Sequence, residues 1–166
     1  MYIILEGVCY MTKKDIIALS KSLNNILSSE KESKLKFKYG IIKMNKAIEG
    51  EIATLSKLED EITKILVPFE QERATIFEKY GYKENDVLKL KEENLAVANE
   101  EFKTIIEKHT DIISESDLRW KEYIKLLDDT VDITLNKINI SIFPDWIEPK
   151  DLIVFTDLNL IDESEE

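Results

Sequence analysis

Cysteine, histidine, glycine and proline are all scarce in this chain of 166 residues, which contains one, one, four and three of them. A lone cysteine, Cys9, excludes an intramolecular disulfide, and one cysteine with one histidine excludes a zinc site of the usual kind. No glycine-rich phosphate loop or dinucleotide fingerprint occurs, so we expect no metal and no cofactor. Little glycine and proline beside 34% charged residues favours long helices.

Long hydrophobic runs are also missing. The apolar opening Tyr2–Leu5 ends at Glu6 and follows no basic residue, so it is neither a signal peptide nor a membrane span. We therefore expect a protein of the cytosol with no membrane partner. Residues 2–9 are either a short strand or an unstructured extension before Met11.

The net charge of −11 is unevenly distributed. Residues 1–46 carry nine lysines against four acidic residues, a net +5, which leaves −16 for the remainder. Such a surface repels duplex DNA over most of its area, so no duplex DNA partner is expected.

Two capping boxes predict the first helices. Thr12 with Asp15 opens a helix to about residue 27, and Ser29 with Glu32 opens a second over residues 30–80. The second helix carries an apolar stripe at steps of three and four, which is typical of a helix packed on another helix. We expect Pro68 to kink it near residues 64–68, and Gly40 is a candidate break.

A short turn at Gly81 then predicts an antiparallel partner helix, capped by Asn85 or Asp86. Its seam recurs at alternating steps of three and four: Leu95, Ala98, Phe102, Ile105, His109 and Ile112. We expect a restart near Ser114. This register places Phe69 near Leu95 or Ala98, and Ile62 near Phe102 or Ile105.

Beyond residue 130 the period changes. Apolar residues alternate over 131–142 with a phase shift at Asn136-Lys137, which predicts a strand with a bulge. Pro149 begins a helix, although residues 153–156 also suit a strand. The acidic residues 162–166 predict a disordered tail. We expect one mainly α domain over residues 1–161: a long, coiled-coil-like antiparallel helical hairpin, an extra N-terminal helix and a small C-terminal β element within 131–161.

Candidate catalytic groups are few. His109 lies on an apolar seam, which favours a satisfied core histidine, and Cys9 has no basic neighbour to activate it. The sequence Pro144-Asp145 with Glu148-Pro149-Lys150 matches a metal-nuclease signature too tightly spaced for two strands. We therefore predict no catalytic residue and no enzymatic activity.

The strongest candidate for a binding site is a lysine-rich stretch that interleaves with aromatic residues. It contains Lys34, Lys36, Phe37, Lys38, Tyr39 and Lys43. Such residues suit a small nucleotide, single-stranded nucleic acid or an acidic partner. The alternative is a solvated helix face that offsets the acidic third helix.

Two stretches carry a family resemblance. The segment FEQERATIFEKYG at residues 69–81 and the runs VDITLNKINI and IEPKDLIVFTDLNLI resemble the bacteriophage domain-of-unknown-function family 1617, over about residues 11–161. Members are small proteins encoded among virion-assembly genes of tailed phages. The resemblance implies no activity, cofactor or functional residue. The helix expected over residues 85–129 is longer than that family's pattern.

Two functions follow. The first is a non-enzymatic phage accessory or virion-assembly protein that acts through protein–protein contacts, in the host cytoplasm or on the virion. The alternative is a phage-encoded inhibitor of a host defence system, either an acidic decoy or a trap for a signalling nucleotide. Apolar residues off the main seams, such as Val97 and Ile106, also predict a homo-oligomer or a tight protein partner.

Overall fold

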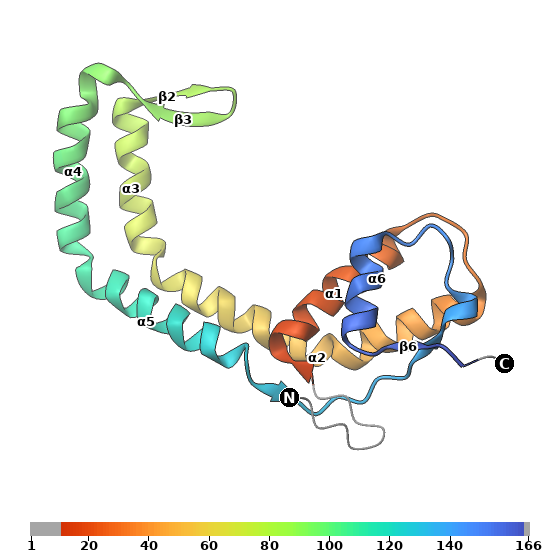
Figure 1. The fold of residues 1–166 in the computed structure, drawn as a ribbon. Coiled ribbons are helices and arrows are strands. Elements are labelled where there is room, and N and C mark those ends of the chain that lie inside the picture. The colour runs from red at the N-terminus through yellow and green to blue at the C-terminus, as the bar shows by residue number, and fades with distance from the viewer. Residues whose placement is uncertain (1–10, 165–166) are drawn as a thin grey trace. The chain divides into compact units, whose positions relative to one another are not determined.

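The computed structural model describes residues 11–164, and the fold is mainly helical with short strands (Figure 1), as the sequence predicts. Contacts group the chain into two compact units. The first contains the residues up to Ser56 and those from Ile124 onward, and the second is Lys57–Tyr123. The expected strand or extension at residues 2–9, and Cys9 with it, lies outside the described residues.

Helix α1 (Lys13–Ser28) begins at the predicted capping box. The Thr12 N–H donates to Asp15 Oδ2 at 2.9 Å, and the Asp15 N–H donates to Thr12 Oγ1 at 3.2 Å. Two N–H groups that lack helical partners are thereby satisfied. The buried face of α1 consists of Ile16, Leu19, Leu23 and Ile26.

Helix α2 (Leu35–Ile65) begins later than predicted. The Ser29 hydroxyl accepts from the Lys31 N–H, which closes a local turn rather than capping a helix. Gly40 does not break α2, contrary to the expectation. A Cβ there would lie 3.0 Å from Ile138 Cδ1, so glycine at this position allows Ile138 to pack against the helix backbone.

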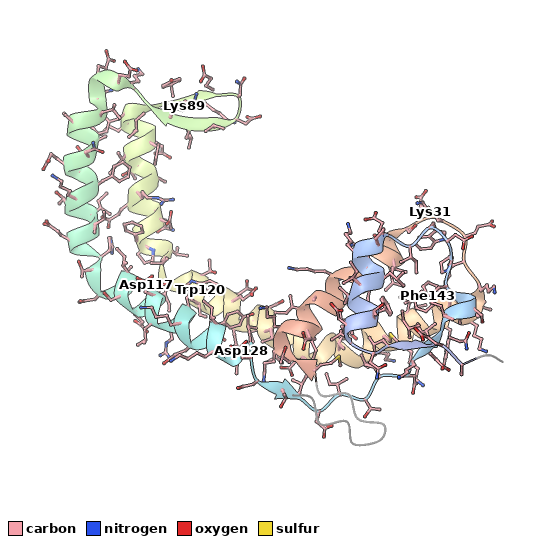
Figure 2. The ribbon with its side chains drawn as sticks, viewed as in Figure 1. Lys31, Lys89, Asp117, Trp120, Asp128 and Phe143 are labelled. Carbon is pink, nitrogen blue, oxygen red and sulfur yellow. The ribbon has the colours of Figure 1, made fainter. Side chains whose placement is uncertain are left out.

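The core of the first unit lies between α1, the N-terminal half of α2 and α6 (Pro149–Asp157). The rings of Phe37 and Phe155 each meet Phe143 edge-on, at centroid distances of 5.2 and 5.7 Å (Figure 2). Helix α6 settles the alternative left open for residues 153–156. Asp151, 4% exposed, faces inward and accepts a hydrogen bond from Asn25.

Residues 131–139 form an extended segment but no continuous strand, so the predicted strand over 131–142 is wrong. β1 (Met11–Thr12) pairs antiparallel with β4 (Thr130–Val131), and β5 (Ile138–Asn139) pairs in parallel with β6 (Ile161–Asp162). A short 3₁₀ turn, η2 (Ile140–Ile142), follows β5. The predicted shift in phase is borne out at Ile138, which is buried after the half-buried Val131, Ile133 and Leu135, but not at Ile140, which is 44% exposed. The side chains of this segment pack on the core, and its backbone pairs with other strands only at β4 and β5.

The end of the chain is more ordered than expected where it is described. Asp162 belongs to β6, and the Ser164 carbonyl accepts from Asn139 Nδ2 at 2.9 Å. Residues 165–166 of the predicted disordered tail lie outside the described part.

The second unit is an antiparallel helical hairpin. The break near Pro68 is confirmed, because α2 ends at Ile65 and α3 (Val67–Tyr80) follows with proline in its first turn. Helix α3 packs beside α4 (Leu95–Lys108), as Figure 1 shows, and α5 (Thr110–Leu126) continues the return path. The break between α4 and α5 falls at His109, not near Ser114.

The predicted register of this hairpin is wrong. Phe69 lies beside His109 at a centroid distance of 6.1 Å, and Phe77 lies beside Phe102 at 5.7 Å. The connection is not a tight turn. It contains a β-hairpin, β2 (Gly81–Glu84) with β3 (Val87–Leu90), followed by the 3₁₀ turn η1 (Glu92–Asn94).

Asn85 and Asp86 therefore form the loop of a hairpin and do not cap a helix. Their φ values are 50° and 62°, and positive φ at both central residues is the feature of a type I′ turn. Asparagine and aspartate tolerate that conformation better than most residues with side chains.

Tyr123 closes the hairpin at its other end. Its hydroxyl donates to Glu59 Oε1 at 2.7 Å, and its ring meets the edge of Trp120 (Figure 2). Burial, followed by this hydrogen bond, raises the pKa of Tyr123 from 10.0 to about 12.

The two helical glycines of α2 give a matched test of packing. Gly50→Ala should stabilise the fold by about 0.5–1 kcal/mol, because a Cβ introduced at this position would have no neighbouring atom within 4 Å. Gly40→Ala should instead destabilise it by roughly 1 kcal/mol, because crowding against Ile138 outweighs the helix propensity. Urea unfolding monitored by circular dichroism measures both, and equal stabilisation by the two substitutions would contradict the close approach.

Tyr123 should make stability fall at alkaline pH. Its folded pKa exceeds the unfolded value, so its contribution is complete below pH 10 and is lost as pH rises through about 12. Tyr123→Phe should remove this part of the pH dependence, at most roughly 2–3 kcal/mol. Urea unfolding at several pH values compares it with Tyr39→Phe at an exposed tyrosine. Identical profiles for both variants and the unsubstituted chain would disprove the assignment.

Candidate functional site

Half of the predicted lysine-rich stretch lines a groove in the first unit. Lys36, Tyr39 and Lys43 project from α2 along one wall, and the extended segment 134–139 forms the opposite wall. The cavity volume is about 360 Å³. This groove is where the structure brings the predicted residues together with others distant in sequence.

The floor of the groove is apolar and its rim is polar. Gly40, Met44 and Ile138 belong to the floor, where Ile138 packs against the helix backbone at Gly40. Among the described lining residues, the side chains charged at neutral pH are three lysines and one carboxylate, a local excess of positive charge. The complete lining comprises Lys36, Tyr39, Gly40, Lys43, Met44, Ala47, Thr134, Leu135, Asn136, Lys137, Ile138, Asn139, Ile142, Asp162 and Ser164.

The other predicted residues lie elsewhere. Phe37 is fully buried in the core, so the prediction that it contacts a ligand is wrong. Phe37 lies on the inward face of α2. Its charged neighbours Lys36 and Lys38 suggested an exposed position instead. Lys34 Nζ donates to the Ser141 carbonyl at 2.9 Å, and Lys38 is exposed on α2 outside the groove.

Sequence reasoning missed the wall opposite α2. Lys137 Nζ donates to Asn159 Oδ1 at 2.8 Å, which holds the lysine beside the groove. The backbone N–H and side chain of Ser164 bond to the Asp162 carboxylate and, with the more distant charge of Lys137, lower its pKa. These residues lie about a hundred positions from Lys36 in the chain, so no local pattern links them.

The β2–β3 hairpin presents a second feature, an apolar tip that consists of Tyr82, Val87 and Leu88. Their exposed fractions are 42%, 56% and 57%. The pairing places Tyr82 and Val87 on one face of the ribbon and Leu88 on the other. Glu84 and Lys89 form an ion pair between them (Figure 2). Apolar side chains are thus exposed on both faces of a two-stranded ribbon.

His109 occupies a packed position in the second unit. Its side chain is 11% exposed, and Nε2 lies 3.2 Å from Glu72 Oε1 without hydrogen-bond alignment. The same Glu72 oxygen accepts from Lys108 Nζ at 2.5 Å, the main cause of its lowered pKa. The packed position beside Phe69 agrees with the prediction of a core histidine, but the prediction that it is satisfied is not borne out, because Nε2 is buried without a hydrogen-bond partner among the described residues.

The nuclease-like residues lie in a turn and at the helix start that follows it. Glu148 is the N-cap residue of α6 without a side-chain capping hydrogen bond; it pairs with Lys150 at 2.8 Å, and this lysine lowers the pKa of Glu148. Asp145 is exposed in the preceding turn. Glu148 and Lys150 therefore neutralise each other at a helix start. Among residues 11–164, no group of three or more histidine, cysteine or acidic side chains is placed to hold a metal ion.

Comparison with known proteins adds no relative: the sequence matches no family model, and neither curated proteins nor solved structures give a significant match. Within residues 11–164, every helix is too short or too polar to cross a membrane.

Phe37 and Tyr39 give a direct test of the corrected site. Phe37→Ala should cost about 3–5 kcal/mol of unfolding free energy, because it empties a fully buried position. Tyr39→Ala should change stability by no more than about 0.5 kcal/mol, since this ring is 66% exposed. Chemical unfolding of both variants measures the difference, and a small loss for Phe37→Ala would restore this residue as a surface contact.

Proposed function

We propose that this protein is a non-enzymatic accessory or virion-assembly protein of a tailed phage, which acts through protein–protein contacts in the host cytoplasm or on the virion. The apolar tip of the β2–β3 hairpin carries the proposal of a protein contact. The phage setting is supported by the resemblance of residues 69–81 and of the two C-terminal runs.

The tip is hard to explain as a purely structural element. An isolated two-stranded ribbon is marginally stable in water, and it gains little from apolar side chains that remain exposed. Tyr82, Val87 and Leu88 are exposed on both faces. A partner that covers the ribbon would bury this surface and stabilise the ribbon at the same time.

The base of the ribbon fixes where the tip projects. Tyr80 donates to Glu101 Oε1 at 2.7 Å, and Lys79 Nζ reaches the same oxygen at 2.6 Å. The lysine is the main cause of the lowered pKa of Glu101, which in turn raises that of Lys79. These contacts join the end of α3 to α4 next to the first residue of β2, so the base of the β-hairpin is attached to both helices.

A second copy of the chain is one candidate partner, as the sequence predicts. The net charge of −11 opposes self-association, but charges separated by more than about 8–10 Å are screened at physiological salt while apolar burial is not. The same tip can therefore serve a homo-oligomer or a different phage or host protein.

The second candidate function is inhibition of a host defence system. The groove favours a trap for a small nucleotide, because it gathers lysines in an acidic protein. The overall charge favours the acidic decoy.

Leu88→Glu should weaken partner binding without unfolding the protein. The new carboxylate would stand directly opposite Lys83, so the ribbon keeps a favourable cross-strand pair while it loses apolar surface. Tagged protein would be purified from phage-infected cells and its stoichiometric phage or host partner identified. That partner would then be bound to each purified variant, and we expect the Kd to rise at least about tenfold, because an apolar anchor at an interface contributes on the order of 1–2 kcal/mol.

Leu118→Glu is the matched control, since Leu118 on α5 is 56% exposed and the same charge is introduced. It should bind as the unsubstituted chain does. Equal loss in both variants, or no loss in Leu88→Glu, would refute the role of the tip. Light scattering of the purified chain separates a second copy from a different partner.

A further inference from the structure

We propose that the groove between α2 and the segment 134–139 binds a mononucleotide-sized phosphate ester that carries an aromatic ring. The observations are the charge of its walls, its apolar floor, the exposed ring of Tyr39 and its volume. This inference rests on the second candidate function, the nucleotide trap, whose ligand class it names, and it is independent of the proposed protein contact, which rests on the hairpin tip.

The groove is lined by positive charge, although the chain as a whole is negatively charged. Three lysines and one carboxylate line it, whereas the whole protein carries −11. Lys36 and Lys43 lie seven residues apart on one face of α2, a separation of about 10 Å along the axis. Lys137 approaches from the opposite wall. Among the described residues that line the groove, lysines from two walls outnumber the single carboxylate, which favours an anion, and phosphate is one that lysine binds well.

Lys43 is the cation most available to a ligand. Within the part of the chain that the structure describes, it makes no hydrogen bond or ion pair, whereas Lys137 is held by Asn159. A phosphate placed beside Lys43 gains a charge-assisted hydrogen bond without breaking an existing one. Lys43 is therefore the residue whose loss should affect affinity most.

The apolar floor selects for more than phosphate. Met44, Ile138 and Ile142 offer an apolar surface that inorganic phosphate cannot use, and Ile138 packs directly against the helix backbone at Gly40. Tyr39 lines the same wall with its ring 66% exposed. An aromatic side chain beside lysines is the combination that stacks a nucleobase while its phosphate is neutralised.

Polar groups at the far wall suit the edge of a base. Asn136 and Asn139 line the groove with Asp162, whose pKa is lowered mainly by the Ser164 backbone N–H. An ionised carboxylate accepts hydrogen bonds from the amino or imino groups of a base and repels a second phosphate. This distribution places the phosphate near α2 and the base toward Asp162.

The size of the groove excludes larger anions. Its volume of about 360 Å³ lies near the lower end of the range of roughly 300–1,000 Å³ for small-molecule sites. A single strand of nucleic acid needs a groove that follows several nucleotides. The site therefore suits one nucleotide rather than a polymer.

Isothermal titration calorimetry of the full chain tests the proposal with named probes: the four common ribonucleoside monophosphates, adenosine, inorganic phosphate and a polyglutamate peptide. We expect at least one monophosphate to bind more tightly than either adenosine or inorganic phosphate. Its affinity should fall as salt is added, because the lysines are exposed to solvent.

Lys43→Gln should weaken that binding at least about tenfold, the effect of losing one hydrogen bond between charged groups. Lys46→Gln is the matched control, because it removes the same charge from an exposed position on α2 outside the groove. Tyr39→Ala should weaken the monophosphate and leave inorganic phosphate unchanged.

Four results would overturn the proposal. They are no monophosphate binding at millimolar concentration, equal affinity for inorganic phosphate and monophosphate, equal losses in Lys43→Gln and Lys46→Gln, or binding of the polyglutamate peptide in place of nucleotides. The last result would assign the groove to an acidic protein segment.

Discussion

Burial of one face of α2 is the constraint on which the first unit depends. Phe37, Ile41, Met44 and Ile48 recur at steps of four and three and are almost fully buried. At about 100° per residue, Lys36, Gly40, Lys43 and Ala47 then lie on the adjacent face. The same periodicity that builds the core therefore aligns the wall of the groove, and Gly40 lets Ile138 close its floor against the helix backbone.

A different constraint governs the second unit, where two helix breaks face each other. Pro68 ends the helical hydrogen bonding of α2, and the helix is interrupted at Leu66. In the returning arm of the hairpin, the break between α4 and α5 falls at His109, whose ring lies beside Phe69. An antiparallel partner must bend at the same level to maintain contact. Proline on one helix thus accounts for a break on the other, where neither glycine nor proline occurs.

The features predicted correctly from the sequence are those that depend on residues close together in the chain. The capping box at Thr12, the break before Pro68 and the phase shift at Asn136-Lys137 each depend on a few neighbouring residues. The predicted register of the hairpin was wrong because Asn85-Asp86 was interpreted as a helix cap, although asparagine and aspartate also suit the positive φ angles of a tight β-hairpin loop. The break at His109 and the far wall of the groove could not be predicted, since tertiary contacts impose them. Phe37 was misassigned because its charged neighbours suggested a surface.

The acidity of the chain is compatible with a site for anions. Over most of the surface the net charge of −11 repels phosphate, but screening at physiological salt limits this repulsion to about 8–10 Å. Within the groove the nearest charges are lysines, and the carboxylate of Asp162 is already bonded to Ser164. Local charge therefore decides what binds there, while distant charge slows the approach of polyanions. The negative charge of the whole protein therefore disfavours nucleic acid polymers, while the positive charge of the groove walls favours a single small anion.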